Sequence, residues 1–342
     1  MFSQANYEYF IDYFCEKVLS MKKIGILTSG GDSPGMNACI RAIVRTSCYY
    51  QIECIGFIRG YEGLIDNQFV VLNRASVSGI IQRGGTILKT ARSERFRTEE
   101  GLKKAAETIQ RHALDGLVII GGDGSFRGAI ELSKYTPVKM IGCPGTIDND
   151  LIGTDFTIGY DTAINTVVEA VDKLRDTAES HDRIFVVEVM GRDAGLIALR
   201  SAIASGAEAI LVPEIKKDVD TLIQKINSWR KDKSSKIIIV AEGDETGGAY
   251  KVAELIKQHK PEHDVRVSIL GHIQRGGHPT CMERVNASII GYQAVKALLD
   301  NKHLMMVGII DKKVCFTPFE KATKHIQEIN PNLIQMLEIL SS

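Results

Sequence analysis

The amino-acid sequence predicts an α/β protein made of two doubly wound, Rossmann-like domains with mostly parallel sheets and a ligand cleft between them. Short apolar runs recur along the chain, and glycine-rich turns and helical patterns separate them, which is typical of βαβ units. A length of 342 residues suits two domains of roughly 100–200 residues each. The 31 glycines fit a chain with many tight βα turns.

The expected elements alternate between strand and helix. The apolar runs predict strands over residues 24–28, 117–120, 139–143, 184–190 and 236–240. One helix between them has an apolar stripe at helical spacing, made of Ile164, Val167, Val168, Val171 and Leu174. Open α/β sheets bind ligands beyond the carboxyl ends of their strands, so the residues after each run are the candidates for function.

Composition excludes several classes of function. Hydrophobic residues make up 44% and charged residues 25% of the chain, which excludes disordered, collagen-like and membrane-bundle proteins. Lys+Arg and Asp+Glu both number 42, so a generic nucleic-acid or anionic-membrane binder is disfavoured. Any anion site must therefore be built from local residues.

Cysteine usage and the N-terminal residues point to the cytoplasm. The seven cysteines form no CxxC pair, which argues against a disulfide framework and a zinc site. No run approaches the ~20 apolar residues that a membrane-spanning helix needs, and Glu8, Asp12 and Glu16 disfavour a signal peptide. The aromatic extension over residues 1–20 is interpreted as an accessory helix, an over-extended start or a partner-docking segment.

The first candidate anion site is the turn TSGGDSPGMN, residues 28–37, between a strand and a helix. Backbone N–H groups at such a helix N-terminus favour phosphate. The spacing of Gly30 and Gly35 resembles a P-loop, but Met36 and Asn37 stand where that loop needs Lys and Ser or Thr. A Walker-type NTPase is therefore disfavoured, and a tight turn without a ligand is the alternative.

The second candidate is the turn GGDGS, residues 121–125, which also follows an apolar strand. Two such turns in one sheet indicate a polyphosphate ligand. Gly121, Gly122 and Gly124 leave room for backbone approach, and Asp123 is placed to hold Mg²⁺ through waters. The alternative is that Asp123 only caps the helix.

The motif PGTIDND, residues 144–150, places two carboxylates after a third strand. Asp148 and Asp150 are two residues apart, so an extended segment would turn both to the same side. Phosphoryl transfer to a hydroxyl needs one carboxylate to take the proton, and another often lies near the metal. Two carboxylates this close would strain an apolar core, so we expect a solvated site with a metal or an arginine nearby. A surface turn rich in Asp and Asn is the alternative.

Basic residues occur at the ends of predicted strands, where a phosphorylated substrate would need them. Arginine binds phosphate oxygens bidentately, and a histidine beside it can also donate. Each one alone could be solvated or salt-bridged, but together they favour a phosphate site: Arg92, Arg183, Arg192, Arg266, His272 and Arg275.

The motifs TSGGDSPGMN, GGDGS, PGTIDND, MGR and GHIQRGG occur in an order and spacing that resembles the bacterial-type ATP-dependent 6-phosphofructokinases. The resemblance runs from about Met21 to about Leu299. It implies an allosteric, homotetrameric kinase of glycolysis that transfers the γ-phosphoryl group of MgATP to the 1-hydroxyl of fructose 6-phosphate. The expected domains are a nucleotide-binding domain over 21–159 plus 275–328 and a fructose 6-phosphate-binding domain over 160–274 plus 329–342.

The resemblance also implies roles for single residues. Asp148 matches the base for the 1-hydroxyl, with Thr146 and Asp150 beside it, and Arg92 and Arg192 replace the missing P-loop lysine at the transferring phosphoryl group. Asp123 matches the aspartate that holds Mg²⁺. It belongs to the nucleotide-binding set, which comprises Gly31, Arg92, Ser93, Phe96, Arg97, Asp123, Gly124, Ser125 and Gly128. Arg183 and Arg266 match residues that reach the sugar phosphate from the adjacent subunit. The whole sugar-phosphate set comprises Thr146, Asp148, Asp150, Arg183, Met190, Gly191, Arg192, Glu242, Arg266, His272 and Arg275.

An intersubunit effector site, activated by ADP and inhibited by phosphoenolpyruvate, is a further implication. Arg41 and Arg45 are i, i+4 on one helix and share a face. Gly79 departs from relatives with an acidic residue there, while Asp182 beside Arg183 is compatible with a two-state exchange and cooperative fructose 6-phosphate binding. The residues that match the effector site are Arg41, Arg45, Arg74, Arg175, Glu208, Lys231 and Lys233. The alternative is that Arg41 and Arg45 belong to a solvated basic helix that binds no effector.

ATP is the predicted phosphoryl donor. Pyrophosphate-dependent relatives typically carry Asp after GGD and Lys in place of the glycine of PGT, whereas this chain has Gly124 and Gly145. Lipid and NAD kinases share a GGDG turn but lack the PGTIDND and GHIQRGG pair. A non-catalytic nucleotide or sugar-phosphate sensor would be expected to lose residues that this chain keeps: Asp148, Asp150, Arg92 and Arg192.

Overall fold

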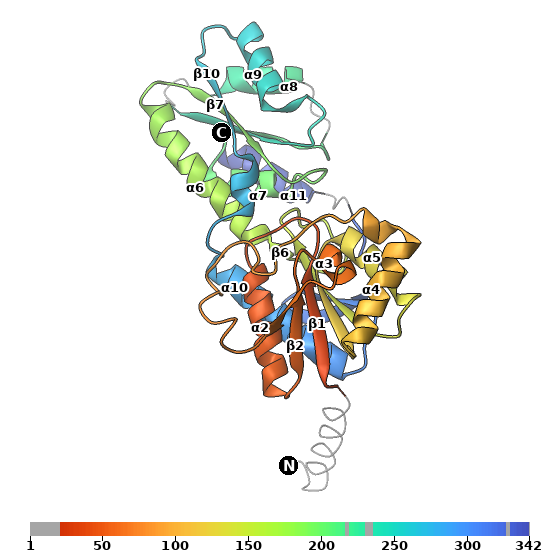
Figure 1. Cartoon of the computed structure of the whole chain (residues 1–342). Helices are drawn as coiled ribbons and strands as arrows, with labels where there is room; N and C mark the ends of the chain where they lie inside the picture. Colours follow the sequence, from red (N-terminus) through yellow and green to blue (C-terminus); the bar gives the residue numbers. More distant parts are fainter. Residues whose placement is uncertain (1–20, 216–218, 230–234, 326–328, 342) are drawn as a thin grey trace. The chain divides into compact units, whose positions relative to one another are not determined.

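The computed structural model describes residues 21–215, 219–229, 235–325 and 329–341, so the extension predicted over 1–20 lies outside the described residues. It confirms the α/β class, and the chain divides into two compact units (Figure 1). The first unit takes the chain up to Thr146, Leu151–Gly159 and His278–Lys324. The second takes Ile147–Asp150, Tyr160–Gly277 and the chain from His325 on.

The first unit contains a mostly parallel sheet with the strand order β12-β11-β5-β4-β1-β2-β3. Its parallel strands are β1 (Lys23–Thr28), β2 (Glu53–Phe57), β4 (Gly116–Gly121), β5 (Lys139–Thr146) and β11 (Met305–Ile310). Two antiparallel strands form the edges, and one short strand pairs with the end of β5: β3 (Phe69–Leu72), β12 (Lys313–Pro318) and β6 (Ile158–Gly159).

Helices cover both faces of this sheet. One face packs against α2 (Met36–Tyr49) and α10 (Cys281–Leu299). The opposite face packs against α3 (Tyr61–Ile65), α4 (Glu99–Arg111) and α5 (Asp123–Ser133). Along β4, Val118 and Ile120 belong to the first core, and Leu117 and Ile119 belong to the second. This two-sided burial explains why the strands are continuous apolar runs in the sequence.

The second unit contains an all-parallel sheet in the order β10-β7-β9-β8. Its strands are β7 (Ile184–Val189), β8 (Ala209–Leu211), β9 (Lys236–Ala241) and β10 (Val265–Ile269). The helices α8 and α9 pack on one face of this sheet, α6 contacts β7 and β9, and α7 contacts β8 and β9. The helical segments are α6 (Tyr160–Glu179), α7 (Leu196–Ser205), α8 (Val219–Ser228), α9 (Gly248–His259), α11 (Pro331–Leu340) and the 3₁₀ helix η2 (Gly271–Arg275).

The five strands predicted from apolar runs are confirmed as β1, β4, β5, β7 and β9, although β7 ends at Val189, one residue early. The predicted apolar stripe lies in α6, where Val167 and Val171 are buried. The described cysteines are free thiols. Within the described residues, no helix combines the length and apolar character needed to span a membrane.

Candidate active site

The two glycine turns of the first unit follow neighbouring parallel strands, β1 and β4. On one side of β1 the sheet continues with β2 and β3, and on the other with β4 and β5, so the chain changes direction between β1 and β4. The Ser29 amide donates to the Ile120 carbonyl of β4 at 2.9 Å, and Ser125 Oγ of the second turn donates to the Ser29 carbonyl at 3.3 Å, which joins the two turns. Ligands of open α/β sheets bind at such a switch point.

The first turn leaves the start of α2 without a side-chain cap. Its N-cap residue, Gly35, has a φ of 103° and makes no side-chain cap hydrogen bond. A Cβ at Gly35 would lie 2.9 Å from side-chain atoms of both Glu283 and Ile158. Glycine is therefore required here, and the first amides of α2 remain uncapped by side chains, as an anion site requires.

Asn37, which the sequence marked only as a departure from a P-loop, organises the segment before Arg92. Its Oδ1 accepts from the Ile87 amide at 2.8 Å. Thr90 Oγ1 donates to the Gly30 carbonyl at 2.9 Å. The segment that leads to Arg92 is therefore tied to both ends of the first turn.

The second turn presents Asp123 at the start of α5. The N-cap residue is Gly122, without a side-chain cap, so the alternative that Asp123 is the cap is wrong. Asp123 Oδ2 lies 2.7 Å from Arg127 Nη2, one helical turn along. A Cβ at Gly122 or Gly124 would meet nothing within 4 Å, so the turn is open to a ligand there.

A magnesium ion fits this turn only as a partner of bound phosphates. No group of three or more His, Cys, Asp or Glu in the described part of the chain could hold a metal. The turn offers the Asp123 carboxylate beside the uncapped start of α5. Mg²⁺ usually keeps several waters and binds one or two carboxylates together with substrate phosphates. One carboxylate in an open turn suits a metal that arrives with a nucleotide.

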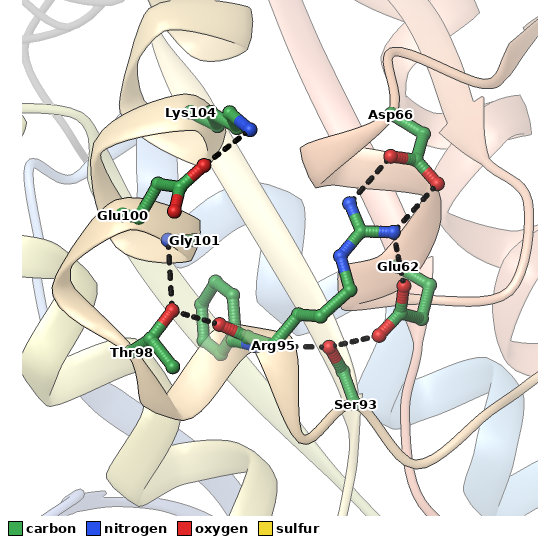
Figure 2. A network of polar contacts seen from close by, with 9 residues as sticks. Glu62, Asp66, Ser93, Arg95, Thr98, Glu100, Gly101 and Lys104 are labelled. Atoms are coloured by element: carbon green, nitrogen blue, oxygen red, sulfur yellow. Dashed lines mark hydrogen bonds and ion pairs between the residues drawn. The ribbon is translucent and has the colours of Figure 1, made fainter.

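Tyr61 and Glu62 of α3 contact three of the predicted nucleotide residues: Ser93, Phe96 and Ser125. Ser93 Oγ donates to Glu62 Oε1 and accepts from the Phe96 amide at 3.0 Å (Figure 2). The Phe96 ring stacks on the Tyr61 ring, with centroids 3.8 Å apart. The Tyr61 hydroxyl donates to the Ser125 carbonyl at 2.6 Å, which connects the stacked rings to the second turn.

Tyr61 was missed by the sequence analysis, although it follows a glycine and precedes a short helix. Burial raises the pKa of Tyr61, so its hydroxyl stays protonated and remains a donor. A Cβ at Gly128 would lie 3.0 Å from the Phe96 ring and 3.4 Å from the Tyr61 ring. Gly128 therefore makes room for the ring stack, while Arg92 and Arg97 are exposed.

Gly124 and Gly145, the two glycines that predict ATP as the phosphoryl donor, differ in their surroundings. Gly124 faces open space, whereas a Cβ at Gly145 would lie 2.9 Å from Met36 Cε and 3.1 Å from Ile120 Cγ2. Met36 stands where a P-loop has its lysine. Gly145 therefore has a packing role against that methionine, which the sequence did not reveal.

The segment after β5 bends where the sequence analysis expected an extended chain. Thr146 ends β5, and Asn149 has a φ of 53°. The extended segment is therefore a wrong prediction, because asparagine adopts the left-handed conformation more readily than most residues. Asp148 and Asp150 are only 4% and 9% exposed, which contradicts both the expectation of a solvated site and the alternative of a surface turn.

In the second unit, Asp148 contacts Arg192. The distance between Asp148 Oδ2 and Arg192 Nε is 3.5 Å. Arg192 has a φ of 52°, and its amide donates to Glu242 Oε1 at 2.8 Å. A cation beside a buried carboxylate offsets part of the free-energy cost of burying that charge. Two predicted catalytic residues and one predicted sugar residue thus form one contact network.

Gln274 is a further residue of this network that the sequence analysis overlooked. It is fully buried in η2, between His272, which is exposed, and Arg275, which is half-buried. Its Oε1 accepts from the Met190 amide at 2.9 Å, and its buried Nε2 has no hydrogen-bond partner among the described residues. Its position inside the motif GHIQRGG could have identified it, but only the charged residues of that motif were predicted to bind phosphate.

Arg183 and Arg266 lie near the starts of the parallel strands β7 and β10, at the opposite end of β7 from Arg192. Arg183 precedes β7 and Arg266 is the second residue of β10, whereas Arg192 follows the carboxyl end of β7. Within one chain these two arginines therefore do not join Arg192, and their predicted role at the sugar phosphate of an adjacent subunit stays a prediction. Both bind Asp264, at 2.7 Å and 3.0 Å, and hydrogen bonding to Arg183 is the main cause that lowers the pKa of Asp264.

The predicted effector residues fall in both units. In α2, burial and, to a lesser degree, the neighbouring charge of Arg45 lower the pKa of Arg41. Arg175 donates to the carbonyls at the end of α7 and lies 3.8 Å from the fully buried Glu208. Arg74 is exposed, and two members of the set lie outside the described residues, Lys231 and Lys233.

Comparisons with known proteins point to one family. The family model for phosphofructokinase matches residues 23–298. The ATP-dependent 6-phosphofructokinase 2 of Bacteroides thetaiotaomicron is 52% identical over 323 residues, which cover 94% of this chain and 99% of that protein. The ATP-dependent 6-phosphofructokinase of Cytophaga hutchinsonii is 51% identical, with 94% and 98% covered.

Solved structures agree with this similarity. The structure of Pichia pastoris phosphofructokinase in the T-state has a TM-score of 0.83 and 35% identity, and covers 88% of this chain and 35% of that chain. A pyrophosphate-dependent phosphofructokinase from Marinobacter aquaeolei has a TM-score of 0.82 at 20% identity, over 94% and 92% of the two chains, which shows a shared fold alone. Because a family model matches most of the sequence and relatives of about half identity span nearly all of it, the chain belongs to the phosphofructokinase family.

Proposed function

We propose that this chain is an ATP-dependent 6-phosphofructokinase, a glycolytic phosphotransferase that converts fructose 6-phosphate and ATP to fructose 1,6-bisphosphate and ADP. The observation that carries the proposal is the buried Asp148 carboxylate with Arg192 Nε at 3.5 Å. A carboxylate can take the proton of an attacking hydroxyl, and a guanidinium can stabilise charge on a transferring phosphoryl group. Relatives with about half identical residues are named for this activity.

The first unit supplies groups suited to a nucleotide. The uncapped starts of α2 and α5 offer backbone amides to phosphate oxygens. Arg92 supplies the positive charge that a P-loop lysine would otherwise give. The buried Tyr61–Phe96 ring stack packs the segment that carries Ser93 beside the second turn. These features support the nucleotide role of this unit.

The second unit supplies groups suited to a sugar phosphate. Glu242 Oε1 accepts from the Arg192 amide, so it fixes the backbone of the MGR motif. His272 and Arg275 in η2 provide donors for a phosphate group. When the sugar binds, Asp148 accepts the proton of its 1-hydroxyl while that oxygen attacks phosphorus, and Arg192 stabilises the charge that develops.

Magnesium enters this proposal as MgATP, with Asp123 as the residue that would hold it. Bound Mg²⁺ neutralises charge on the β- and γ-phosphates. The protein's part is to release Asp123 from its 2.7 Å contact with Arg127 and to keep the carboxylate at the start of α5.

ATP is the proposed donor over pyrophosphate. The space beside Gly124 is open, so the α-phosphate of a nucleotide can be accommodated there. An aspartate at this position would place a negative charge in that space. The pyrophosphate-dependent neighbour in fold is only 20% identical, whereas the two relatives described above, both named for ATP, are 52% and 51% identical.

The oligomer and the effector site are further parts of the proposal. Arg183 and Arg266, held together by Asp264, would bind the sugar phosphate of an adjacent subunit in a homotetramer. Arg41 and Arg45 form a positive face suited to an anionic effector. The free cysteines fit a reducing compartment such as the cytoplasm.

The proposal is tested by measuring fructose 1,6-bisphosphate formation from fructose 6-phosphate and Mg²⁺, with ATP or with pyrophosphate. We expect turnover with ATP in the wild type and its loss in Asp148→Ser. Turnover with pyrophosphate alone would contradict the donor. No product with either donor, from a folded protein that binds nucleotide, would favour the sensor alternative.

A further inference from the structure

Arg95 joins the segment that carries the predicted nucleotide residues to α3. Its Nη2 lies 2.5 Å from Asp66 Oδ1, and its Nη1 lies 3.2 Å from Asp66 Oδ2 (Figure 2). The same Nη1 lies 3.1 Å from Glu62 Oε2. One guanidinium therefore bridges two carboxylates that are four residues apart on α3 and its C-cap.

The second oxygen of Glu62 holds the nucleotide segment itself. Glu62 Oε1 accepts from Ser93, and Ser93 in turn accepts from the Phe96 amide. Thr98 fixes the other end of the segment, because its hydroxyl donates to the Arg95 carbonyl at 2.7 Å and accepts from the Gly101 amide in α4 at 3.1 Å. Residues 93–98 are thus held on both sides.

We expect the charge of Arg95 to affect the affinity for an anionic ligand more than the free energy of unfolding. An exposed ion pair contributes little to folding, and the Arg95 side chain is 51% exposed. Without Arg95, however, Glu62 and Asp66 are like charges at i, i+4, which repel each other. They would also repel an anionic nucleotide that binds at the adjacent Ser93 and Phe96.

We propose that Arg95 is a positioning residue for the nucleotide: it neutralises Glu62 and Asp66 and thereby fixes Ser93 and the Phe96–Tyr61 stack beside the second glycine turn. Arg95 acts through α3, and the inference rests on the proposed function for the identity of the nucleotide. Since Tyr61 also binds the Ser125 carbonyl, a shift of α3 would move the second turn as well.

The test compares variants by steady-state kinetics and by calorimetric titration with MgADP in the absence of the sugar, with the titrations done in an Arg41→Ala background so that ADP does not bind at the proposed effector site. In Arg95→Met we expect the KM for ATP and the Kd for MgADP to rise about 3- to 10-fold. The KM for fructose 6-phosphate, kcat and Tm should stay near wild type. Arg95→Lys should recover part of the affinity, because a point charge replaces the fork.

A second substitution tests the charge argument. Adding Asp66→Asn to Arg95→Met removes one of the two repelling carboxylates, so nucleotide affinity should partly return. Lys103→Met is the matched control, since Lys103 is a similarly exposed cation whose nearest carboxylate, Glu99, lies at 2.7 Å on the same helix. The control should leave the nucleotide constants unchanged.

Unchanged nucleotide constants in Arg95→Met, equal rises for both substrates, or no recovery in the double variant would overturn the inference. If the wild type binds MgADP but makes no product, the proposed function fails alone, and the MgADP titrations still decide the role of Arg95. If the wild type binds no MgADP, both the inference and the nucleotide role of this turn are overturned.

Discussion

At the scale of single residues, Asp148 combines burial with a nearby cation. Its side chain is 5% exposed, and Arg192 Nε is 3.5 Å from its Oδ2. This arrangement keeps water away from the carboxylate while it remains able to accept a proton from a bound hydroxyl. An amide of the same shape would preserve the packing but could not accept that proton.

The first prediction concerns this carboxylate. In Asp148→Asn we expect kcat to fall roughly 10³-fold, within the range known for removing a general base, while the KM for fructose 6-phosphate changes little. Initial-rate kinetics measures both constants. Asp172→Asn, on an exposed position of α6, is the control with wild-type constants. A kcat within threefold of wild type would show that Asp148 is not the base.

The second prediction concerns Gln274. Gln274→Leu removes the acceptor of the Met190 amide, and a buried unpaired group costs about 1–3 kcal/mol. We expect a lower free energy of unfolding by about that amount and a several-fold higher KM for fructose 6-phosphate. Urea unfolding and kinetics measure the two effects. A wild-type KM for fructose 6-phosphate in the Leu variant would contradict this role of Gln274.

At the scale of elements, burial decided what the sequence could predict. Parallel strands covered on both faces are continuous apolar runs, so β1, β4 and β5 were predicted. The edge strand β3 was not, because three of its four residues are exposed and its pairing with β2 defines it. The bend after Thr146 was missed because the left-handed conformation of Asn149 replaces the extended chain there.

The candidate site shows the same division. The glycine turns and the acidic motif are local patterns, so the sequence revealed them. Tyr61, Gln274 and Asp264 act on partners far along the chain: 64 residues separate Tyr61 from Ser125, and 84 separate Gln274 from Met190. No local pattern encodes such pairs, so the structure was needed to find them.

The third prediction concerns the junction between β5 and β11. His303 Nδ1 accepts a hydrogen bond from the Met140 amide at 3.2 Å, so this nitrogen carries no proton and the ring is uncharged. Burial, with a smaller effect of Lys139, lowers the pKa of His303 below its ordinary 6.5. As pH falls through 6.5, the unfolded chain therefore binds the proton first, and the folded state loses stability.

We expect Tm to fall between about pH 7 and pH 5, and to fall less in His303→Asn, whose Oδ1 can still accept from the amide. Thermal unfolding across this pH range measures the difference. Some slope should remain, because burial also lowers the pKa of His112. Parallel Tm curves for wild type and variant would contradict the role of His303.

At the scale of the whole molecule, the two units carry different parts of the proposed chemistry. The nucleotide turns lie in the first unit, and Asp148, Arg192 and Glu242 lie in the second. The chain passes from one to the other between Thr146 and Ile147, inside PGTIDND. The assignment of one substrate to each unit stays a prediction, as does the homotetramer.

The fourth prediction tests whether neighbouring subunits share sites. If Arg266 serves the sugar phosphate of an adjacent subunit, oligomers that mix Asp148→Asn and Arg266→Ser chains will contain some sites with both residues intact. We expect such hybrids, prepared by co-expression with two affinity tags, to be more active than either parent. Hybrids that are no more active than their parents would place Arg266 outside a shared site.

Transfer of the γ-phosphoryl group of ATP to the 1-hydroxyl of fructose 6-phosphate can be followed directly by ³¹P NMR of the purified protein with both substrates and Mg²⁺. We expect the γ-phosphorus signal to disappear while a phosphomonoester on carbon 1 and the signals of ADP appear in equal amounts. Inorganic phosphate in place of the new ester, or an unchanged ATP spectrum, would contradict it.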